Sequence, residues 1–343
     1  MKHFFLFLTV VFVGLFLFNL NHQQKFTTDE KPILRVYAYN SFTSKWGPGP
    51  VLKEMFEKQC NCRIEFAEGS NAGILLQKLK IEGEGLGADL VIGLDQLDLP
   101  KALEGLKWQQ LNFGKLDWED QIKPALANNY FVPYDWGALT FMGQKDGLVP
   151  HRLDDLLDPA FKGRILIEDP RTSSPGFQFL HWVIQSKGEE AGFQFLEKLL
   201  PQANLGIPSW SAAIGLFNKN PGQIVFTYVT SPLYYQLEEK RSDRVAFGME
   251  EALPLQVEFL AIPDFCRRCE LSEKFVNLIL SPEGQKVLMQ KNYMMPVLKG
   301  IKDETPFSDV LKNRHFLNFE IPSTADVDHL IKKWGELRRE TGS

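Results

Sequence analysis

The apolar and polar positions after residue 31 alternate between strand-like and helix-like patterns. Short apolar or alternating runs are followed by longer stretches with apolar residues at helical spacing, and the run ADLVIGL is almost wholly apolar, as in a buried strand. The predicted strands are 33–39, 62–68 and 88–94, and the predicted helices are 48–59, 72–83 and 96–106, the last interrupted by Pro100. This order predicts a mostly parallel sheet with helices on its faces.

Two later extended stretches, 128–144 and 255–262, are candidates to cross between two lobes. The first is too long for one ordinary strand. Between them, strands are predicted at 163–170 and 223–229, and helices at 177–185, 192–200, 211–219 and 231–240. We therefore expect an α/β fold of two lobes, each a mostly parallel sheet flanked by helices, with a ligand cleft between them. Residues 31–133 plus 258–343, with the C-terminal helices, would form lobe 1, and residues 134–257 would form lobe 2.

The first 30 residues carry a targeting pattern. Lys2 precedes an apolar run from Phe4 to about Leu20, as in a secretory signal peptide. The run is about as short as a membrane-spanning helix can be. Residues 1–30 are therefore interpreted as a signal peptide or an N-terminal anchor. The protein is expected in the periplasm, and attached to the membrane if the segment is not cleaved.

Charge and motifs exclude several classes of function. The net charge is −5 and the sequence pI is near 5.8, with no basic block or stripe, which argues against a nucleic-acid partner. The chain has no G-x-S-x-G, H-E-x-x-H or Walker sequence, and no two histidines stand at metal-ligand spacing. We therefore predict no catalytic residue, no metal and no cofactor, and a protein that is not an enzyme.

The four cysteines occur as two close pairs, Cys60 with Cys62 and Cys266 with Cys269. Structural disulfides within each pair, or free thiols, are the simplest interpretation for an exported protein. Two alternatives stay open: a four-thiolate zinc site and a thiol–disulfide exchange role for the CRRC sequence.

The sequence DPRTSSPGF opens a predicted helix in a way that suits an anion. Its N-cap would be Thr172, Ser173 or Ser174, with Pro175 at the first helical position. Free backbone N–H groups, hydroxyls and the partial positive charge of a helix start together favour a negative group. Arg171 would add a full charge. Capping alone is the alternative interpretation.

A second set of residues follows the predicted strands or lies between helices. These are Tyr39, Asn71, Asp95, Trp210, Tyr228, Tyr234 and Tyr293. Aromatic faces with a few polar groups suit a flat cationic or heteroaromatic ligand, and the hydroxyl turn would suit a phosphate on it. Alternatively, the aromatic residues belong to the core or rim, and Asp95 caps its helix. Asp135 is expected only to orient the crossing backbone.

Six segments carry a resemblance to a known family in collinear order. They are YAYNSFTSKWGPGPVLKEMFEKQCNC, ADLVIGLD, FVPYDWG, EDPRTSSPG, VTSPLYYQLEEK and NYMMPV. From about residue 32 to about residue 335 the chain resembles the periplasmic thiamine-binding proteins of ABC importers. The resemblance implies a type II periplasmic binding fold. It also implies that the ligand is thiamine, thiamine monophosphate or thiamine diphosphate, delivered to an ABC transporter permease.

The resemblance also implies roles for individual residues. The aromatic clamp would consist of Tyr39, Trp210, Tyr228, Tyr234 and Tyr293, and the anion end of Thr172, Ser173 and Ser174. Asn71 would meet the aminopyrimidine edge of the ligand. The chain departs from the family pattern at Asn71, where the family has Asp, and at Tyr293, where it has Trp. An amide accepts a weaker hydrogen bond than a carboxylate, and a phenol ring is a weaker cation–π partner than an indole.

Three other functions are weighed against thiamine capture. Ferric-ion binding would use adjacent phenolates, which Tyr234 and Tyr235 offer, although neighbouring residues on a helix do not face each other. Binding of another organic cation, such as a polyamine, would leave the anion end unused. An enzyme acting on thiamine would need an activated nucleophile, and the sequence offers none in place.

Overall fold

One continuous sheet runs through the computed structural model, which describes residues 31–69, 72–112, 114–220 and 222–342. Its strands are β1 (Ile33–Tyr39), β2 (Arg63–Gly69), β3 (Leu90–Asp95), β4 (Val132–Gln144), β5 (Ile165–Glu168), β6 (Ala203–Ile207), β7 (Ile224–Tyr228), β8 (Arg244–Ala246), β9 (Leu255–Ala261) and β10 (Met295–Pro296). They follow the order β2-β1-β3-β9-β4-β7-β5-β6, with β8 and β10 also paired to β4. The predicted N-terminal segment 1–30 and Asn71 lie outside the described residues.

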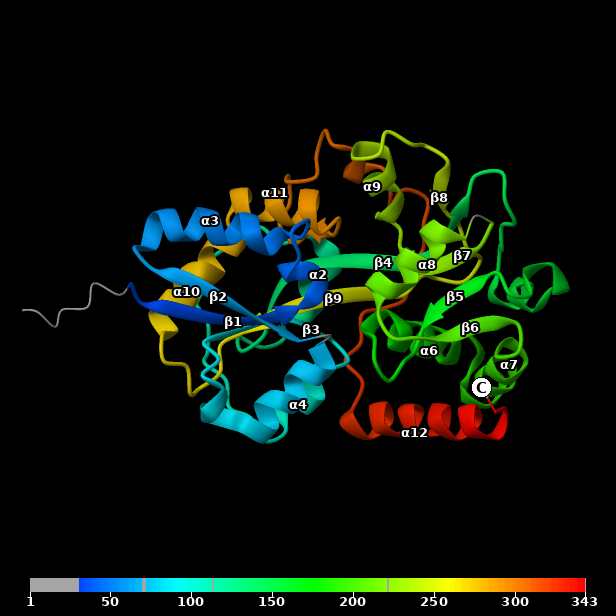
Figure 1. Ribbon diagram of the computed structural model, residues 1–343, viewed down its shortest axis with the longest axis horizontal. Helices are drawn as coiled ribbons and strands as arrows, with labels where there is room; N and C mark the ends of the chain where they lie inside the picture. The colour runs from blue at the N-terminus through cyan, green and yellow to red at the C-terminus, as the bar shows by residue number, and fades with distance from the viewer. Residues whose placement is uncertain (1–30, 70–71, 113, 221, 343) are drawn as a thin grey trace, which may run out of the picture.

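Strand β4 joins the two parts of the sheet. Its first part, from Val132 to Ala138, pairs antiparallel with β9, and its second part, from Leu139 to Met142, pairs antiparallel with β7. We call β2, β1, β3, β9 and the beginning of β4 the first sheet half, and the end of β4 with β7, β5, β6 and β8 the second sheet half. Figure 1 shows β4 and β9 running side by side across the middle of the molecule.

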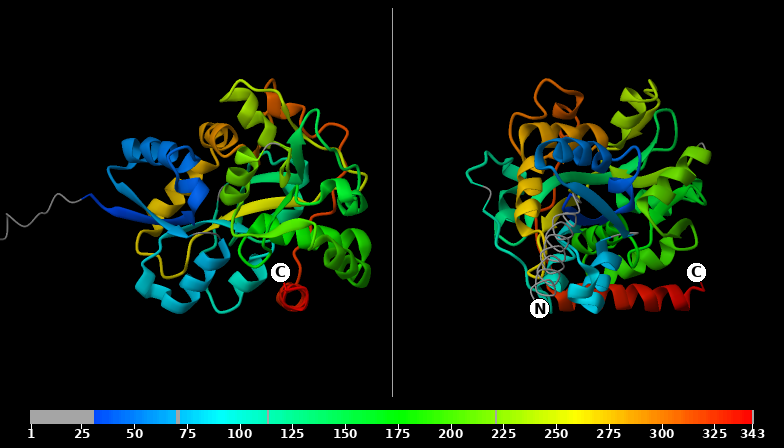
Figure 2. Two further views of the ribbon diagram at one scale, coloured as in Figure 1. Left: turned by 45° about the vertical axis from the view of Figure 1, so that its right-hand side comes forward. Right: turned by 60° about the vertical axis from the view of Figure 1, so that its left-hand side comes forward.

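Helices cover both faces of each sheet half. They are α2 (Asn40–Thr43), α3 (Pro48–Cys60), α4 (Ala72–Glu82), α5 (Leu99–Leu103), α6 (Ser174–Lys187), α7 (Glu189–Leu199), α8 (Trp210–Lys219), α9 (Ser231–Leu237), α10 (Cys269–Ile279), α11 (Pro282–Lys291) and α12 (Thr324–Glu340). Short 3₁₀ segments are η1 (Gly83–Leu86), η2 (Asp120–Leu126), η3 (Leu153–Leu157), η4 (Pro159–Phe161) and η5 (Pro306–Ser308). Helices α3, α10 and α11 lie over one face of the first sheet half and α4 under the other (Figures 1 and 2). Within the described residues, no helix is both long and apolar enough to cross a membrane.

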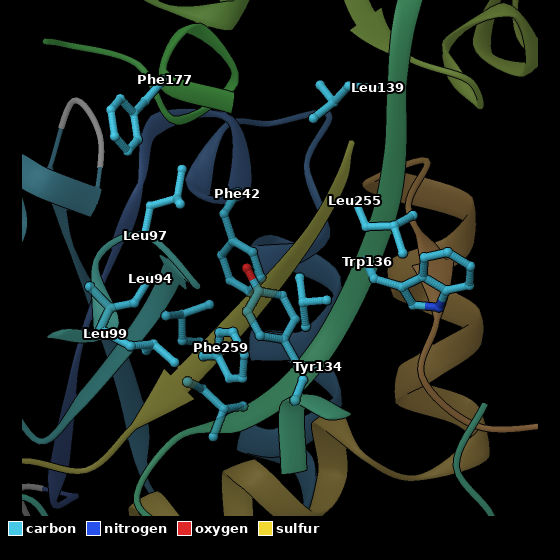
Figure 3. Packing of buried hydrophobic residues seen from close by; sticks show 14 of the residues in the cluster. Phe42, Leu94, Leu97, Leu99, Tyr134, Trp136, Leu139, Phe177, Leu255 and Phe259 are labelled. Atoms are coloured by element: carbon cyan, nitrogen blue, oxygen red, sulfur yellow. The ribbon is translucent and has the colours of Figure 1, made fainter. Parts of the chain in front are cut away.

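The crossing strands lie in the core rather than on the surface. Nearly every residue of β4 is buried, and all of β9 is buried. In Figure 3 the rings of Tyr134 from β4, Phe42 from α2 and Phe259 from β9 gather at the middle of the first sheet half. The indole nitrogen of Trp136 donates a hydrogen bond to the carbonyl oxygen of Pro296 at 2.9 Å, so this buried donor is satisfied. The two crossings therefore form a packed hinge region instead of a loose linker.

Most predicted elements are confirmed, and three differences are local. Pro100 lies in the first turn of α5 and does not interrupt a longer helix, because proline is tolerated where its missing N–H would have no partner. Strand β6, with the sequence ANLGI, was not predicted because Asn and Gly are poor strand formers and it lies at the sheet edge. The helix predicted over 231–240 is shorter, since α9 spans Ser231–Leu237.

The C-terminal helix α12 contacts the second sheet half. The indole nitrogen of Trp334 lies 3.3 Å from a carboxylate oxygen of Asp169, and the guanidinium of Arg338 donates to the carbonyl oxygen of Leu205 at 3.0 Å. The division into lobes at 133/134 and 257/258 stays a prediction. This division assigns α12 to lobe 1, whereas α12 contacts Asp169 and Leu205 of the second sheet half.

Both cysteine pairs form local disulfides, Cys60–Cys62 and Cys266–Cys269. This agrees with the simplest interpretation of the sequence. The sulfurs are joined within each pair instead of forming a four-thiolate zinc site.

Candidate ligand-binding site

The site is built where strand ends meet the crossing strands. Tyr39 ends β1, Asp95 ends β3 and Tyr228 ends β7. Asp95 stands opposite Glu258 of β9 in the sheet register. The hydroxyl of Tyr39 donates to Oε2 of Glu258 at 2.8 Å. The carboxyl ends of the strands thus converge on the hinge region, as the sequence predicts for an open α/β sheet.

A buried hydrogen-bond network ties the two crossing strands to β1 and to the loop after α11. The hydroxyl of Tyr134 donates to the same Glu258 oxygen at 2.5 Å. The side-chain amide of Asn292 donates to the hydroxyl of Tyr39 at 2.9 Å and to Oδ2 of Asp135 at 2.7 Å. Asp135 is completely buried and its other oxygen has no hydrogen-bond partner within the described residues. Asp135 therefore takes part in a side-chain network next to Tyr39, beyond the backbone role expected from the sequence.

Burial shifts the acids and phenols of the site toward their protonated forms. Burial raises the pKa of Asp95 to about 6, against hydrogen bonds that favour the carboxylate. Burial and the nearby charge of Glu258 raise the pKa of Asp135 well above its usual range. Burial likewise raises the pKa of Glu258. Burial and these carboxyl groups also raise the pKa of Tyr39 and Tyr228 well above its ordinary value, so both phenols stay protonated. A bound cation would reverse the penalty on the carboxylates.

The predicted anion end at the start of α6 lies against one of these acids. Ser173 is the N-cap and Ser174 the first helical residue, and the side chain of Ser174 is close enough to Asp95 to lower the pKa of that carboxyl. Gln178, one turn further along, lies 3.5 Å from the same carboxylate. Asp95 also accepts the backbone N–H of Leu97 at 2.8 Å in the turn before α5, whose N-cap is Asp98, so Asp95 is not the cap of that helix. The start of α6 and the end of β3 therefore contact each other through Asp95.

Arg171 does not contribute a free charge to this turn. Its guanidinium is paired with the carboxylate of Asp169, with contacts of 2.6 and 2.9 Å. The expectation that Arg171 strengthens the anion end is therefore wrong in this structure. Thr172 lies in the same turn, and its backbone N–H donates to the carbonyl oxygen of Asp169 at 3.0 Å.

Two members of the aromatic clamp come from the second sheet half and lie together. The ring centroids of Trp210 and Tyr228 are 6.5 Å apart and tilted by 53°. The indole nitrogen of Trp210 donates to the hydroxyl of Thr227 at 2.8 Å, which fixes the ring. Trp46, on the side of the first sheet half, lies next to the ring of Trp210, with ring centroids 6.5 Å apart. Trp46 is 51% exposed. Trp46 stands in the quoted WGPGP motif but was not among the residues predicted for the site.

Two further members of the predicted clamp, Tyr234 and Tyr293, form an edge-to-face pair with centroids 5.5 Å apart. Tyr293 has a left-handed backbone with φ of 54°, which is uncommon for a bulky residue and costs energy that its surroundings must offset. Its hydroxyl donates to Oε1 of Glu238 at 3.0 Å. Because Tyr293 follows Asn292, this turn also connects the clamp to Tyr39 and Asp135.

Two glycines make room for the clamp. A Cβ atom at Gly93 would lie 2.2 Å from Cδ1 of Tyr39, and the backbone there has φ of +103°. A Cβ atom at Gly137 would lie 2.7 Å from Cδ1 of Tyr228. Only glycine therefore permits both rings to lie against the strands where they do.

Glu168, at the end of β5, is a buried acid that was not among the residues predicted for the site. It is completely buried, and neither of its carboxyl oxygens has a hydrogen-bond partner within the described residues. Burial raises its pKa to about 8, so it is mostly protonated at neutral pH. When ionised, Glu168 raises the pKa of Tyr228 further, after burial and the charges of Glu258, Asp135 and Asp95. Acids inside otherwise apolar strands, as in ILIE and LQVEFLAI, were the sequence feature that could have revealed this cluster.

The arrangement of the two adjacent tyrosines does not suit a shared metal. The hydroxyl of Tyr235 donates to Asn218 at 2.8 Å, and its side chain is 2% exposed. Tyr234 is 37% exposed and packs against Tyr293. Their rings are nearly perpendicular, at 85°. The two phenols therefore face different surroundings.

Comparison with known proteins identifies the family. The family model described as bacterial extracellular solute-binding protein matches residues 52–314. The chain belongs to the bacterial extracellular solute-binding proteins. This membership confirms the predicted periplasmic binding fold and places the chain among extracytoplasmic binding proteins rather than enzymes.

Within this solute-binding family the chain resembles proteins named as thiamine-binding. It is 36% identical over 269 residues to the thiamine-binding periplasmic protein of Salmonella typhimurium, covering 78% of this chain and 81% of that one. It is 32% identical over 310 residues to the protein of that name from Haemophilus influenzae, covering 88% and 90%. A solved structure of a periplasmic thiamin binding protein superposes with a TM-score of 0.80 at 31% identity, covering 91% of this chain and 97% of that chain.

Proposed function

We propose that this solute-binding protein captures thiamine outside the cytoplasm and delivers it to an ABC permease. The observation that carries the proposal is the joining of an aromatic clamp to a buried acid cluster. Trp210 and Tyr228 lie together, and Tyr39 donates a hydrogen bond to Glu258 of the acid cluster at 2.8 Å. The thiazolium ring of thiamine is a flat cation, which aromatic faces and carboxylates both attract. The names of the relatives support the same ligand.

The phosphate forms of thiamine are the finer part of the proposal. The start of α6 offers free backbone N–H groups and the hydroxyls of Ser173 and Ser174. Asp95 beside Ser174 opposes a phosphate there while it is ionised, and Arg171 is already paired. We infer that thiamine itself is the preferred ligand and that thiamine monophosphate and diphosphate bind through this turn more weakly.

Ferric-ion capture is the less favoured alternative. It would need two phenolates that converge on one point, and the hydroxyl of Tyr235 is instead bonded to Asn218. Export through the N-terminal segment 1–30, either cleaved or retained as an anchor, remains part of the proposal because the apolar run after Lys2 supports it.

The proposal is tested by titrating the purified protein with thiamine, thiamine monophosphate and thiamine diphosphate while following tryptophan fluorescence. Trp46 and Trp210 lie at the site and would report binding directly. We expect saturation at micromolar concentrations or below, with thiamine bound most tightly. Two further titrations, one with ferric ion and citrate and one with spermidine, test the alternative ligands under the same conditions. Saturable binding of either of these, with none of thiamine, would contradict the proposal.

A further inference from the structure

A basic cavity lies at the opposite end of the first sheet half from the candidate site. It measures about 250 Å³ and is lined by Lys31, Pro32, Ile33, Arg35, Gly87, Asp89, Arg267 and Arg268. Ile33 begins β1 and Lys31 stands two residues before it, whereas Tyr39 ends that strand at the site. A strand of seven residues at about 3.3 Å per residue separates the two by roughly 20 Å. In Figure 1 the start of β1 lies at the end of the molecule far from the second sheet half.

The cavity is strongly positive although the whole chain is negative. Four of its lining side chains are cationic and one, Asp89, is acidic. Arg35 has one weak ion pair, with Glu65 at 4.0 Å, where both side chains are about half exposed. Within the described residues, no carboxylate forms an ion pair with Lys31, Arg267 or Arg268. In a chain of net charge −5, this local excess of cations is an exception.

The single acid of the cavity is used to hold backbone and does not neutralise the arginine side chains directly. Asp89 is 2% exposed. One of its oxygens accepts the backbone N–H groups of Arg267 and Arg268, each at 2.8 Å, and the other accepts that of Arg35 at 2.9 Å. These bonds fix the backbone from which three of the four cations project.

A covalent link fixes the same loop. The disulfide Cys266–Cys269 encloses only Arg267 and Arg268. Helix α10 begins at Cys269, directly after them. The backbone of this pair of arginines is thus held from both sides, by the disulfide and by Asp89. A Cβ atom at Gly87 would lie 3.1 Å from a guanidinium nitrogen of Arg35, so the glycine there, with φ of +65°, leaves room for that side chain.

We propose that this basic cavity is a second binding site, for a phosphate group. Guanidinium groups match the oxygens of phosphate with paired hydrogen bonds, and several held on fixed backbone lose less freedom on binding than free side chains would. The phosphate could be carried by a free phosphate ester or by the headgroup of an anionic phospholipid. Both offer the same chemistry to Arg35, Arg267 and Arg268. The site is independent of the thiamine proposal because it lies at the other end of the strands.

The first test measures binding of inorganic phosphate and of glycerol 3-phosphate to the full chain by calorimetry at low ionic strength, with thiamine present in saturating amount. The variant Arg267→Gln with Arg268→Gln keeps the disulfide and the backbone bonds to Asp89, so it should fold. We expect it to weaken phosphate binding at least tenfold. The matched control, Lys332→Gln with Arg339→Gln on exposed positions of α12, removes the same charge and should bind phosphate as the unmodified chain does.

The second test distinguishes the two sources of phosphate. The same three proteins are sedimented with vesicles of phosphatidylglycerol and, for comparison, of phosphatidylcholine. Because all three share residues 1–30, a loss confined to the Arg267 and Arg268 variant reports the cavity alone. Loss of binding only to phosphatidylglycerol vesicles would support a lipid headgroup, and loss of binding to glycerol 3-phosphate would support a free ester. Equal losses in the variant and the control, or no binding of either probe to the unmodified chain, would overturn the proposal.

Discussion

The indole nitrogen of Trp210 donates a hydrogen bond to the hydroxyl of Thr227 at 2.8 Å, and that hydroxyl in turn shares a hydrogen bond with Ser231 at 2.8 Å. Trp210 begins α8, Thr227 lies in β7 and Ser231 begins α9. The orientation of the principal ring of the clamp is therefore set by two neighbouring elements and not by its own helix alone.

This relationship makes a graded prediction for ligand affinity. Trp210→Ala should raise the Kd for thiamine about tenfold or more, because stacking on a desolvated cation contributes about 2 kcal/mol. Thr227→Val keeps the ring but removes its hydrogen bond, and should raise the Kd by roughly two- to tenfold. Calorimetric titration measures the Kd of both variants. Tryptophan fluorescence is not used here because Trp210→Ala removes one of the fluorophores at the site. An unchanged Kd in Trp210→Ala would remove the ring from the site.

The start of α6 predicts a difference between ligands. The double variant Ser173→Ala, Ser174→Ala should weaken thiamine monophosphate and diphosphate more than thiamine, because the hydroxyls supplement the helix N–H groups toward an anion. Ser186→Ala near the other end of the same helix is the control and should change none of the three affinities. Equal losses for thiamine and its phosphates would show that the two hydroxyls do not act on the phosphate itself.

Glu168 predicts how stability depends on pH. Its pKa is raised from 4.5 to about 8 by burial, so between these values the folded state holds a proton that the unfolded state releases. Its contribution therefore lowers the free energy of unfolding as pH rises through this window, by about 1.4 kcal/mol per pH unit. Glu168→Gln, which carries no ionisable proton, should flatten that part of the dependence.

Urea unfolding of the unmodified chain and of Glu168→Gln at pH 5, 6.5 and 8 measures this difference. The exposed Glu190→Gln is the control and should parallel the unmodified chain. Asp95, Asp135 and Glu258 also have raised pKa values and are present in all three proteins, so only the difference between proteins is interpreted. Parallel curves for Glu168→Gln and the unmodified chain would contradict the prediction.

Asn292 predicts a loss of both stability and affinity. Its amide is a donor to Tyr39 and to Asp135, whose other oxygen already has no partner among the described residues. Asn292→Ala should lower the free energy of unfolding by about 1–3 kcal/mol, the usual cost of leaving a buried polar group unpaired. It should also weaken thiamine binding, because Tyr39 loses a support.

Asn220→Ala serves as the matched control for this change. The amide of Asn220 donates to the carbonyl oxygen of Leu216 at the exposed end of α8, so its removal should cost less. Equal losses in the free energy of unfolding for the two variants, measured by urea unfolding, would show that the buried network around Asn292 stabilises the fold no more than an exposed hydrogen bond does.

The sequence by itself determined the local elements, the crossing strands and the residues at the strand ends. The alternation of apolar runs and helical spacing predicted β1, α3 and β3 within a few residues, because these patterns depend only on neighbours in the chain. The long extended stretch at 128–144 predicted the crossing strand β4. The quoted motifs led to the family, which the comparisons confirm.

Only the tertiary structure decided which polar residues share the site. Asp135 and Glu258 stand 123 positions apart and become neighbours because β4 and β9 pair across the hinge region. Arg171 leaves the anion end because Asp169 is its nearer partner, and Trp46 joins Trp210 from the other sheet half. Whether a carboxyl is charged depends on burial by distant segments, so Glu168 could not be distinguished from an ordinary acid until β5, β6 and β7 were placed around it.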